Sequence, residues 1–129
     1  MKRSLWLGLV AVAVVAAAIS IIALPKGPEW TTSSPEALAE FELALQAKMK
    51  LYQVDAVAHL EKAVELDPDF VMARLMLADF VWYTDRTQAE ELVAKVLEAD
   101  VDSLRPRERF YVERSRAIHA KQTDDADRL

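Results

Sequence analysis

The chain has 129 residues, a formal net charge of −5 and no cysteine. This length allows one small domain at most, and the lack of cysteine excludes disulfides, zinc-thiolate sites and a cysteine nucleophile. The acidic balance argues against nucleic acid as a partner. The two glycines, Gly8 and Gly27, precede a long stretch rich in Ala, Leu, Glu and Lys, which favours helix.

The first predicted element is an apolar run at residues 5–24, which Pro25 closes. About 20 apolar residues with a rise of about 1.5 Å each cover a hydrocarbon core of about 30 Å, so the run predicts a transmembrane anchor. The three alanines at residues 16–18 could form a signal-peptide cleavage site, but the apolar run continues past them. An uncleaved anchor is therefore favoured over a cleaved signal peptide.

Basic residues predict the orientation of this anchor. Lys2 and Arg3 lie in a short tail at residues 1–4, whereas Lys26 alone follows the run. The positive-inside rule places the tail in the cytoplasm and residues 25–129 on the periplasmic or extracellular face of the cytoplasmic membrane. Since Lys2 and Arg3 are two of the 16 basic residues, this exported part keeps 14 basic and 21 acidic residues, a net charge of −7.

A linker is predicted at residues 25–34, before a helical domain at residues 35–129. Its end carries several helix-start signals, because Ser34 can cap a helix with Pro35 in the first turn, or Ser33 can begin a capping box. Helices are predicted at residues 35–50, 54–66, 68–83, 87–99 and 106–121, with a stub at 124–129. The connectors between them are short enough to force antiparallel neighbours.

The clearest pattern lies in the second predicted helix. Ala56, Leu60 and Ala63 are spaced i, i+4 and i+7, which places them on one face where another helix can approach closely. Asp67 then precedes Pro68 and is predicted to cap a new helix that begins at this proline. Two helices are therefore expected to pack side by side across a tight polar turn.

This pattern resembles the second half of a tetratricopeptide repeat, a helical hairpin with a period of about 34 residues. The large-small pair of the first helix stands at residues 43–44 and again at 77–78, while Glu40 occupies the usual tryptophan position. A third copy begins near Pro106 and stops within its second helix. The resemblance implies an all-α fold, in which a right-handed α-hairpin solenoid of about two and a half repeats follows the transmembrane helix.

A wider resemblance covers residues 5–129. The apolar run, Thr-Thr-Ser-Ser-Pro-Glu-Ala-Leu at 31–38, Asp-Pro-Asp-Phe at 67–70 and Arg-Pro-Arg-Glu-Arg-Phe-Tyr-Val-Glu at 105–113 look like the repeat region of bacterial membrane-anchored serine/threonine kinases and related signalling proteins. The sequence has no Gly-rich phosphate loop, no Val-Ala-Ile-Lys strand and no His-Arg-Asp loop. The resemblance implies an anchor and a scaffold without kinase activity.

The resemblance also implies a binding groove, because the first helices of successive tetratricopeptide units line a concave surface that binds peptides or partner helices. Carried over by position, the groove residues are Leu38, Phe41, Leu45, Met49, Met72, Leu75, Asp79, Trp82, Tyr83 and Tyr111, with Ser115 as a further position. Aromatic and methionine side chains suit an apolar or aromatic-bearing peptide. In a short array the same side chains can instead form the core, and this alternative stays open.

Patterns for catalysis or metal binding are weak. His59 and His119 lie far apart in helical patterns, without cysteines or paired carboxylates at metal-ligand spacing. Asp67 and Asp69 are explained by the turn between two helices, and the basic residues at 105–121 by the solvated face of the last helix. We expect no enzyme activity, no cofactor and no small-molecule substrate, and a protein or peptide as the partner.

Three functional hypotheses follow from the sequence. The first is a membrane-tethered scaffold that holds a partner protein near the outer face of the cytoplasmic membrane. The second is a remnant of a larger signalling or transport-associated protein whose other parts did the work. The third is a secreted soluble repeat protein, released by signal cleavage.

Overall fold

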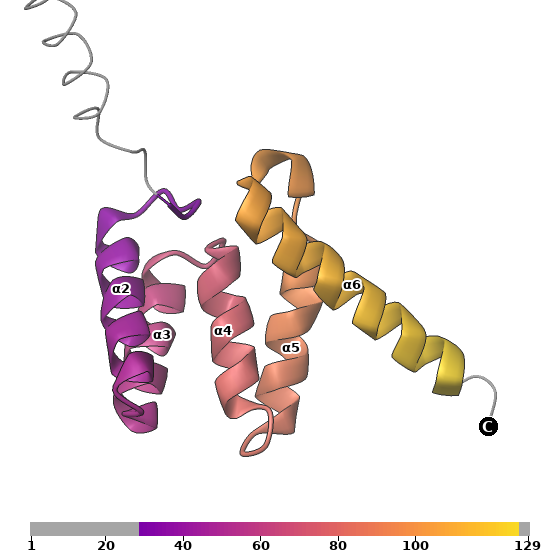
Figure 1. The fold of residues 1–129 in the computed structure, drawn as a ribbon, viewed down its shortest axis with the longest axis horizontal. Helices are drawn as coiled ribbons and strands as arrows, with labels where there is room; N and C mark the ends of the chain where they lie inside the picture. The colour runs from indigo at the N-terminus through magenta and orange to yellow at the C-terminus, as the bar shows by residue number, and fades with distance from the viewer. Residues whose placement is uncertain (1–28, 127–129) are drawn as a thin grey trace, which may run out of the picture.

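The structure, a computed structural model, describes residues 29–126, and this part of the chain is all-helical (Figure 1). Its elements are α2 (Pro35–Met49), α3 (Gln53–Leu66), α4 (Val71–Val81), α5 (Arg86–Leu97), the 3-10 turn η1 (Val101–Ser103) and α6 (Pro106–Ala126). The all-α prediction is confirmed for these residues. The predicted tail and anchor at residues 1–24 lie outside the described part, within which no helix is both long and apolar enough to cross a membrane.

The helices pack in chain order. Contacts join α2 to α3, α3 to α4, α4 to α5 and α5 to α6. The hairpins α2–α3 and α4–α5 stand side by side, and α6 crosses α5 at a slant so that its second half extends beyond the other helices (Figure 1). The predicted antiparallel order of neighbours is therefore present from α2 to α5.

The end of α6 differs from the prediction of a helix at 106–121 and a separate stub. A single helix runs from Pro106 to Ala126. The predicted connector at residues 122–123 contains neither proline nor glycine, and the Thr123 hydroxyl donates to the carbonyl of His119 at 3.0 Å, one turn earlier. Nothing in this sequence interrupts the helix.

An aromatic cluster joins the segment before α2, α2 itself and the turn between α3 and α4. The rings of Trp30 and Phe41 meet edge-on at 5.4 Å, and those of Phe41 and Phe70 lie 4.9 Å apart. All three side chains are buried. Around them, α2 and α3 approach each other closely through buried small side chains, as predicted for one face of α3: Ala37, Ala44, Ala47, Ala56, Leu60 and Ala63.

The start of α2 confirms one of the two predicted caps. Ser34 is the N-cap, and its hydroxyl accepts a hydrogen bond from the amide of Ala37 at 3.1 Å, with Pro35 in the first turn. An oxygen at this position satisfies one of the backbone amides that have no partner inside the helix. The serine therefore fixes where the helix begins.

The turn between α3 and α4 corrects the prediction that a helix begins at Pro68 with Asp67 as its cap. The helix begins at Val71, and Asp67 directly follows α3. The Asp67 carboxylate accepts from the amide of Asp69 at 3.0 Å and from that of Ser33 at 3.2 Å. Because it is occupied with the turn and with a distant segment, it does not cap α4.

Residues 29–34, which we call the N-terminal strap, were predicted as the end of a linker but pack against the domain. The Thr31 amide donates to Oε1 of Glu108 at 2.7 Å, and the Thr32 hydroxyl donates to the Asp67 carboxylate. The N-terminal strap thus connects the α3–α4 turn with the first turn of α6. It is part of the folded unit.

Glu108 is the only fully buried charged side chain in the described part of the chain, with an exposed fraction of 0%. Its carboxylate accepts from the amide and hydroxyl of Thr31, and from the amide of Arg105 at 3.1 Å. The bond to Arg105 is the carboxylate half of a capping box at the start of α6. A carboxylate in the first turn also interacts favourably with the helix dipole.

Candidate functional site

The candidate site is a groove of about 600 Å³ between α4, α5 and α6, which we call the α4–α6 groove. Its apolar lining consists of Leu75, Trp82, Tyr83, Val93, Ala94, Leu97 and Ile118. Its polar lining consists of Asp79, Arg86, Glu90, Ser115, His119 and Gln122. The groove exists because α6 packs on α5 mainly through its first half, where Val112 is buried, whereas residues 117–124 are all exposed.

The structure brings together four of the predicted groove residues in one place. Leu75, Asp79, Trp82 and Tyr83 all line the α4–α6 groove, and the further position Ser115 lines it from α6. These residues come from the second half of α4, the turn that follows it and the middle of α6. Four of the ten predicted positions, and the further position Ser115, therefore share one groove.

The other predicted residues lie elsewhere. Phe41 and Met72 are buried in the core, and Leu38, Leu45 and Tyr111 are partly buried and pack against it. The remaining one, at the end of α2, is Met49, which is largely exposed but does not line the groove. For the five positions other than Met49, the core alternative describes the packing better than a shared binding surface.

The α5 and α6 sides of the groove were not predicted. Val93 and Leu97 are spaced i, i+4 on α5, so they lie on one face of that helix. Ile118 is an apolar residue within a charged stretch of α6, and 47% of its surface is exposed. These patterns could have suggested a second wall, but only the crossing of α6 over α5 places them opposite α4.

The end of the groove is formed by two aromatic residues at the end of α4. Tyr83 is 93% exposed, whereas Trp82 is partly buried and packs against the core. The Arg86 guanidinium lies 3.8 Å from the centre of the Trp82 ring and pairs with Glu90 at 2.7 Å. This stacking holds the indole in place beside the groove.

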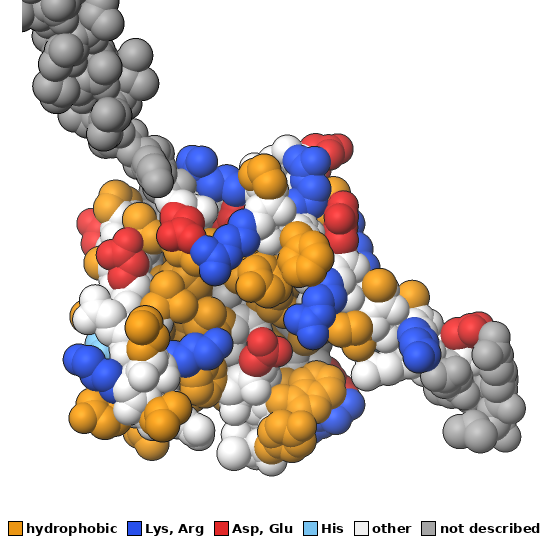
Figure 2. Space-filling view, in the orientation of Figure 1, with side chains coloured by type: hydrophobic (Ala, Val, Ile, Leu, Met, Phe, Trp, Pro, Cys, Tyr) orange, Lys and Arg blue, Asp and Glu red, His pale blue; other side chains and the backbone are white. Residues whose placement is uncertain are grey.

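Asp79 differs from the other charged residues of the groove lining, Arg86 and Glu90, which pair with each other. Partial burial raises the pKa of its carboxyl group, while the positive charges of Lys48 on α2 and Arg114 on α6 act to lower it. Within the described residues, the Asp79 carboxylate has no ion-pair or hydrogen-bond partner. On the face shown in Figure 2, acidic side chains near the centre lie between basic ones, and hydrophobic side chains gather below them.

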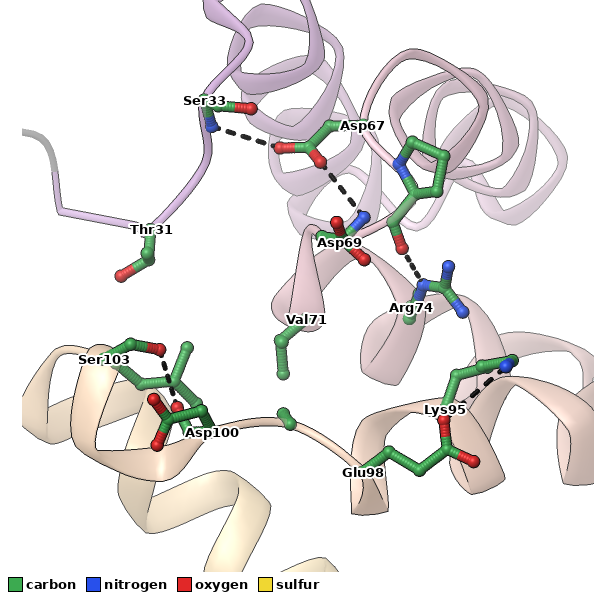
Figure 3. Close-up of a pocket in the computed structure, with 13 residues that line it drawn as sticks. Thr31, Ser33, Asp67, Asp69, Val71, Arg74, Lys95, Glu98, Asp100 and Ser103 are labelled. Atoms are coloured by element: carbon green, nitrogen blue, oxygen red, sulfur yellow. Dashed lines mark hydrogen bonds and ion pairs between the residues drawn. The ribbon is translucent and has the colours of Figure 1, made fainter.

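A second cleft, of about 580 Å³, lies beneath the N-terminal strap (Figure 3). Several of its charged side chains contact neighbours: Lys95 pairs with Glu98 at 3.5 Å, and Arg74 donates to the carbonyl of Pro68. The Asp67 carboxylate holds the strap, as described above. Among residues 29–126 no group of three or more His, Cys, Asp or Glu side chains is placed to hold a metal ion.

Two arginines of α6, which were predicted to lie on a solvated face, donate hydrogen bonds to backbone carbonyls of the preceding segment. Arg116 donates to the carbonyls of Leu97 and Ala99 at 2.8 and 2.7 Å, where the end of α5 leaves acceptors without helical partners. Arg109 donates to the carbonyl of Val101 at 3.0 Å. These side chains stabilise the α5–α6 connection, so the basic stretch is partly structural.

The two histidines lie in unrelated settings. His59 on α3 contacts Glu40 on α2 at 2.7 Å, and Lys62 contacts the same carboxylate at 2.6 Å. The hydrogen bonds from Lys62 and then His59 hold the pKa of Glu40 below its ordinary value. An ionic cluster therefore joins α2 and α3 at Glu40, while His119 lines the α4–α6 groove.

The chain matches no protein-family model, no curated protein and no solved structure. Its function is therefore inferred from the residues and geometry described above.

Proposed function

We propose that the chain is a membrane-tethered helical scaffold that binds a segment of a partner protein in the α4–α6 groove. The observation that carries this proposal is the uncovered apolar lining, in which Tyr83 is 93% and Ile118 47% exposed beside the fixed Trp82 ring. Concave apolar surfaces with a few polar groups are the usual sites for ligands, and grooves between helices commonly bind peptide helices. The scaffold acts through binding and not through catalysis.

Support for a tetratricopeptide-like array comes from two sources. The large-small pairs at residues 43–44 and 77–78 fall in α2 and α4, the first helices of the two hairpins. Each hairpin packs on the next in chain order. In this proposal α6 is the first helix of a third unit, and the groove lies on the side where its second half leaves the bundle.

The tether in this proposal is the apolar run at residues 5–24, with the helical domain on the periplasmic or extracellular face. Two alternatives predict other products. A secreted protein would yield a mature chain that begins at or near Ile19, which N-terminal sequencing of the product detects. If the chain were a remnant of a larger protein, no partner protein would bind to it through the groove.

The groove assignment is tested by crosslinking the full-length chain in membranes and comparing captured partners. Trp82→Ala and Tyr83→Ala should each reduce the recovery of a specific partner, by about tenfold if the aromatic residues are binding hot spots. Tyr52→Ala is the matched control, because Tyr52 is exposed at the opposite hairpin. Unchanged recovery in both groove variants, or an equal loss in the control, would overturn the proposal.

A further inference from the structure

The apolar part of the α4–α6 groove is shaped by residues from three helices. Leu75 comes from α4, Val93 and Leu97 from α5, and Ile118 from the opposite wall on α6. Its lining contains no basic side chain besides Arg86, which is held against Trp82. This part of the groove suits an aliphatic or aromatic side chain.

The polar part of the groove carries a net negative charge. One cation, Arg86, and two carboxylates, Glu90 and Asp79, line it, which gives a formal charge of −1 when His119 is neutral. Arg86 and Glu90 pair with each other at 2.7 Å. The charge that remains is that of Asp79.

The Asp79 side chain is exposed in the groove, where its carboxylate can accept a hydrogen bond from a ligand. Lys48 and Arg114 act on its carboxylate from α2 and α6, but neither forms an ion pair with it in the described part of the chain. An ionised carboxylate can only accept hydrogen bonds, so a ligand group that satisfies it must be a donor. Ammonium and guanidinium groups form the strongest such bonds.

From this arrangement we infer that the partner segment inserts an apolar side chain between α5 and α6 and presents a lysine or arginine to Asp79. This inference rests on the function proposed above and specifies the chemistry of its ligand. Segments with an acidic residue at the same position are disfavoured, because their carboxylate would face that of Asp79.

The test is a selection of random short peptides, displayed on phage, against the purified full-length chain in lipid nanodiscs. Wild-type protein should enrich peptides that carry an apolar residue near a lysine or arginine. Synthetic copies should lose affinity by about tenfold for Asp79→Lys, since a charge-assisted hydrogen bond is replaced by repulsion, and less for Asp79→Asn. Replacing the basic residue of the peptide by glutamate should restore binding to Asp79→Lys.

The matched control is Glu91→Lys, which makes the same charge change at an exposed position of α5 outside the groove lining. The affinity of this variant for the selected peptides should stay within about twofold of wild type, because Glu91 does not line the groove and its charge acts on the peptide only through screening solvent. Circular dichroism should show that each variant keeps its helical content.

The outcomes separate the two proposals. If selected peptides lose binding in Trp82→Ala but show no basic preference, or bind Asp79→Lys and Asp79→Asn as tightly as wild type, the ligand chemistry is wrong and the groove function stands. If acidic peptides are selected instead, Lys48 and Arg114 recognise the ligand and the inference is overturned. If no selected peptide depends on Trp82, the proposed function fails together with the inference.

Discussion

The two ends of the helical domain differ in the side chains that they carry and in how far these are buried. At one end the N-terminal strap crosses the α3–α4 turn and the start of α6, and its polar groups pair with the buried carboxylates of Asp67 and Glu108. At the other end lie the α2–α3 and α4–α5 turns (Figure 1), where Leu51 and Tyr83 are 82% and 93% exposed. The strap end satisfies its polar groups internally, whereas the turn end leaves apolar surface uncovered.

This difference indicates a division of roles along the helices. Buried hydrogen-bonded carboxylates are costly to disrupt, because their partners lose all compensation. Exposed apolar side chains contribute little to folding and are available for contact. Substitutions should therefore destabilise the protein at the strap end, whereas at the turn end those that line the α4–α6 groove should affect binding.

The largest effect on folding is expected for Trp30→Ala at the strap end. This substitution removes a buried ring that contacts Phe41 and lies under the Arg107 guanidinium at 4.9 Å, and should cost about 3–5 kcal/mol of unfolding free energy. Trp82→Ala is the matched control at the groove, where the ring is partly exposed, and should cost much less. Equal losses in urea unfolding would contradict the division between the ends.

Glu108→Gln should be the next most damaging change. The amide has one acceptor oxygen in place of two, while Thr31 and Arg105 supply three donors to this position. We expect a loss of about 2 kcal/mol in unfolding free energy. Glu113→Gln, at an exposed position of the same helix, should leave the unfolding midpoint unchanged, and a comparable loss there would show that helix propensity and not the strap is responsible.

A change of opposite sign is expected for Leu51→Gly at the turn end. Leu51 has a φ of 62° in the left-handed region, just after α2, where the amide of Tyr52 donates to the carbonyl of Ala47 at 2.9 Å. Glycine adopts this conformation without strain, so the variant should be more stable by about 0.5 kcal/mol. Met49→Gly, inside the last turn of α2, should instead destabilise. A loss of stability in Leu51→Gly would show that its side chain packs in the folded protein.

The smallest effect concerns the ionic cluster between α2 and α3, away from both ends. Because hydrogen bonds from Lys62 and His59 hold the pKa of Glu40 below its ordinary value of 4.5, its ionised form stabilises the folded state. This contribution is present above pH 4.5 and is lost as the pH falls through the lowered pKa. Glu40→Gln should therefore flatten the acid-side decline of the urea midpoint, whereas Glu42→Gln, exposed on the same helix, should not.

Much of the helical layout could be predicted from local sequence. The Ser34-Pro35 start and the i, i+4, i+7 face of α3 depend on neighbouring residues, and both are present. The start of α4 could not be predicted, because the Asp67 carboxylate accepts hydrogen bonds from Thr32 and Ser33 of the distant strap and does not cap the helix. The length of α6 was underestimated, since polar residues at 122–123 suggested a turn without any true helix breaker.

The candidate site was predicted only in part for a related reason. Trp82 and Tyr83 were predicted to end their helix, but α4 ends at Val81 and both residues follow it in the turn to α5, beside the groove. Phe41 was predicted to line the same groove, yet it is buried and packs against Trp30 and Phe70. Whether an aromatic residue is core or surface depends on segments distant in the chain, and a single sequence contains no direct sign of such contacts.

The N-terminal strap also changes how the array must fold and unfold. A stack of helical hairpins is nearly one-dimensional, so its terminal helix can normally fray while the rest stays intact. The hydrogen bond from Thr31 to Glu108 joins residues 77 positions apart and so links the first segment of the stack directly to its last helix. The last helix then cannot detach without releasing the first segment, and folding is completed only when both ends of the domain have met. A chain whose helices pack mainly on their neighbours in sequence thereby gains the all-or-none cooperativity of a compact domain.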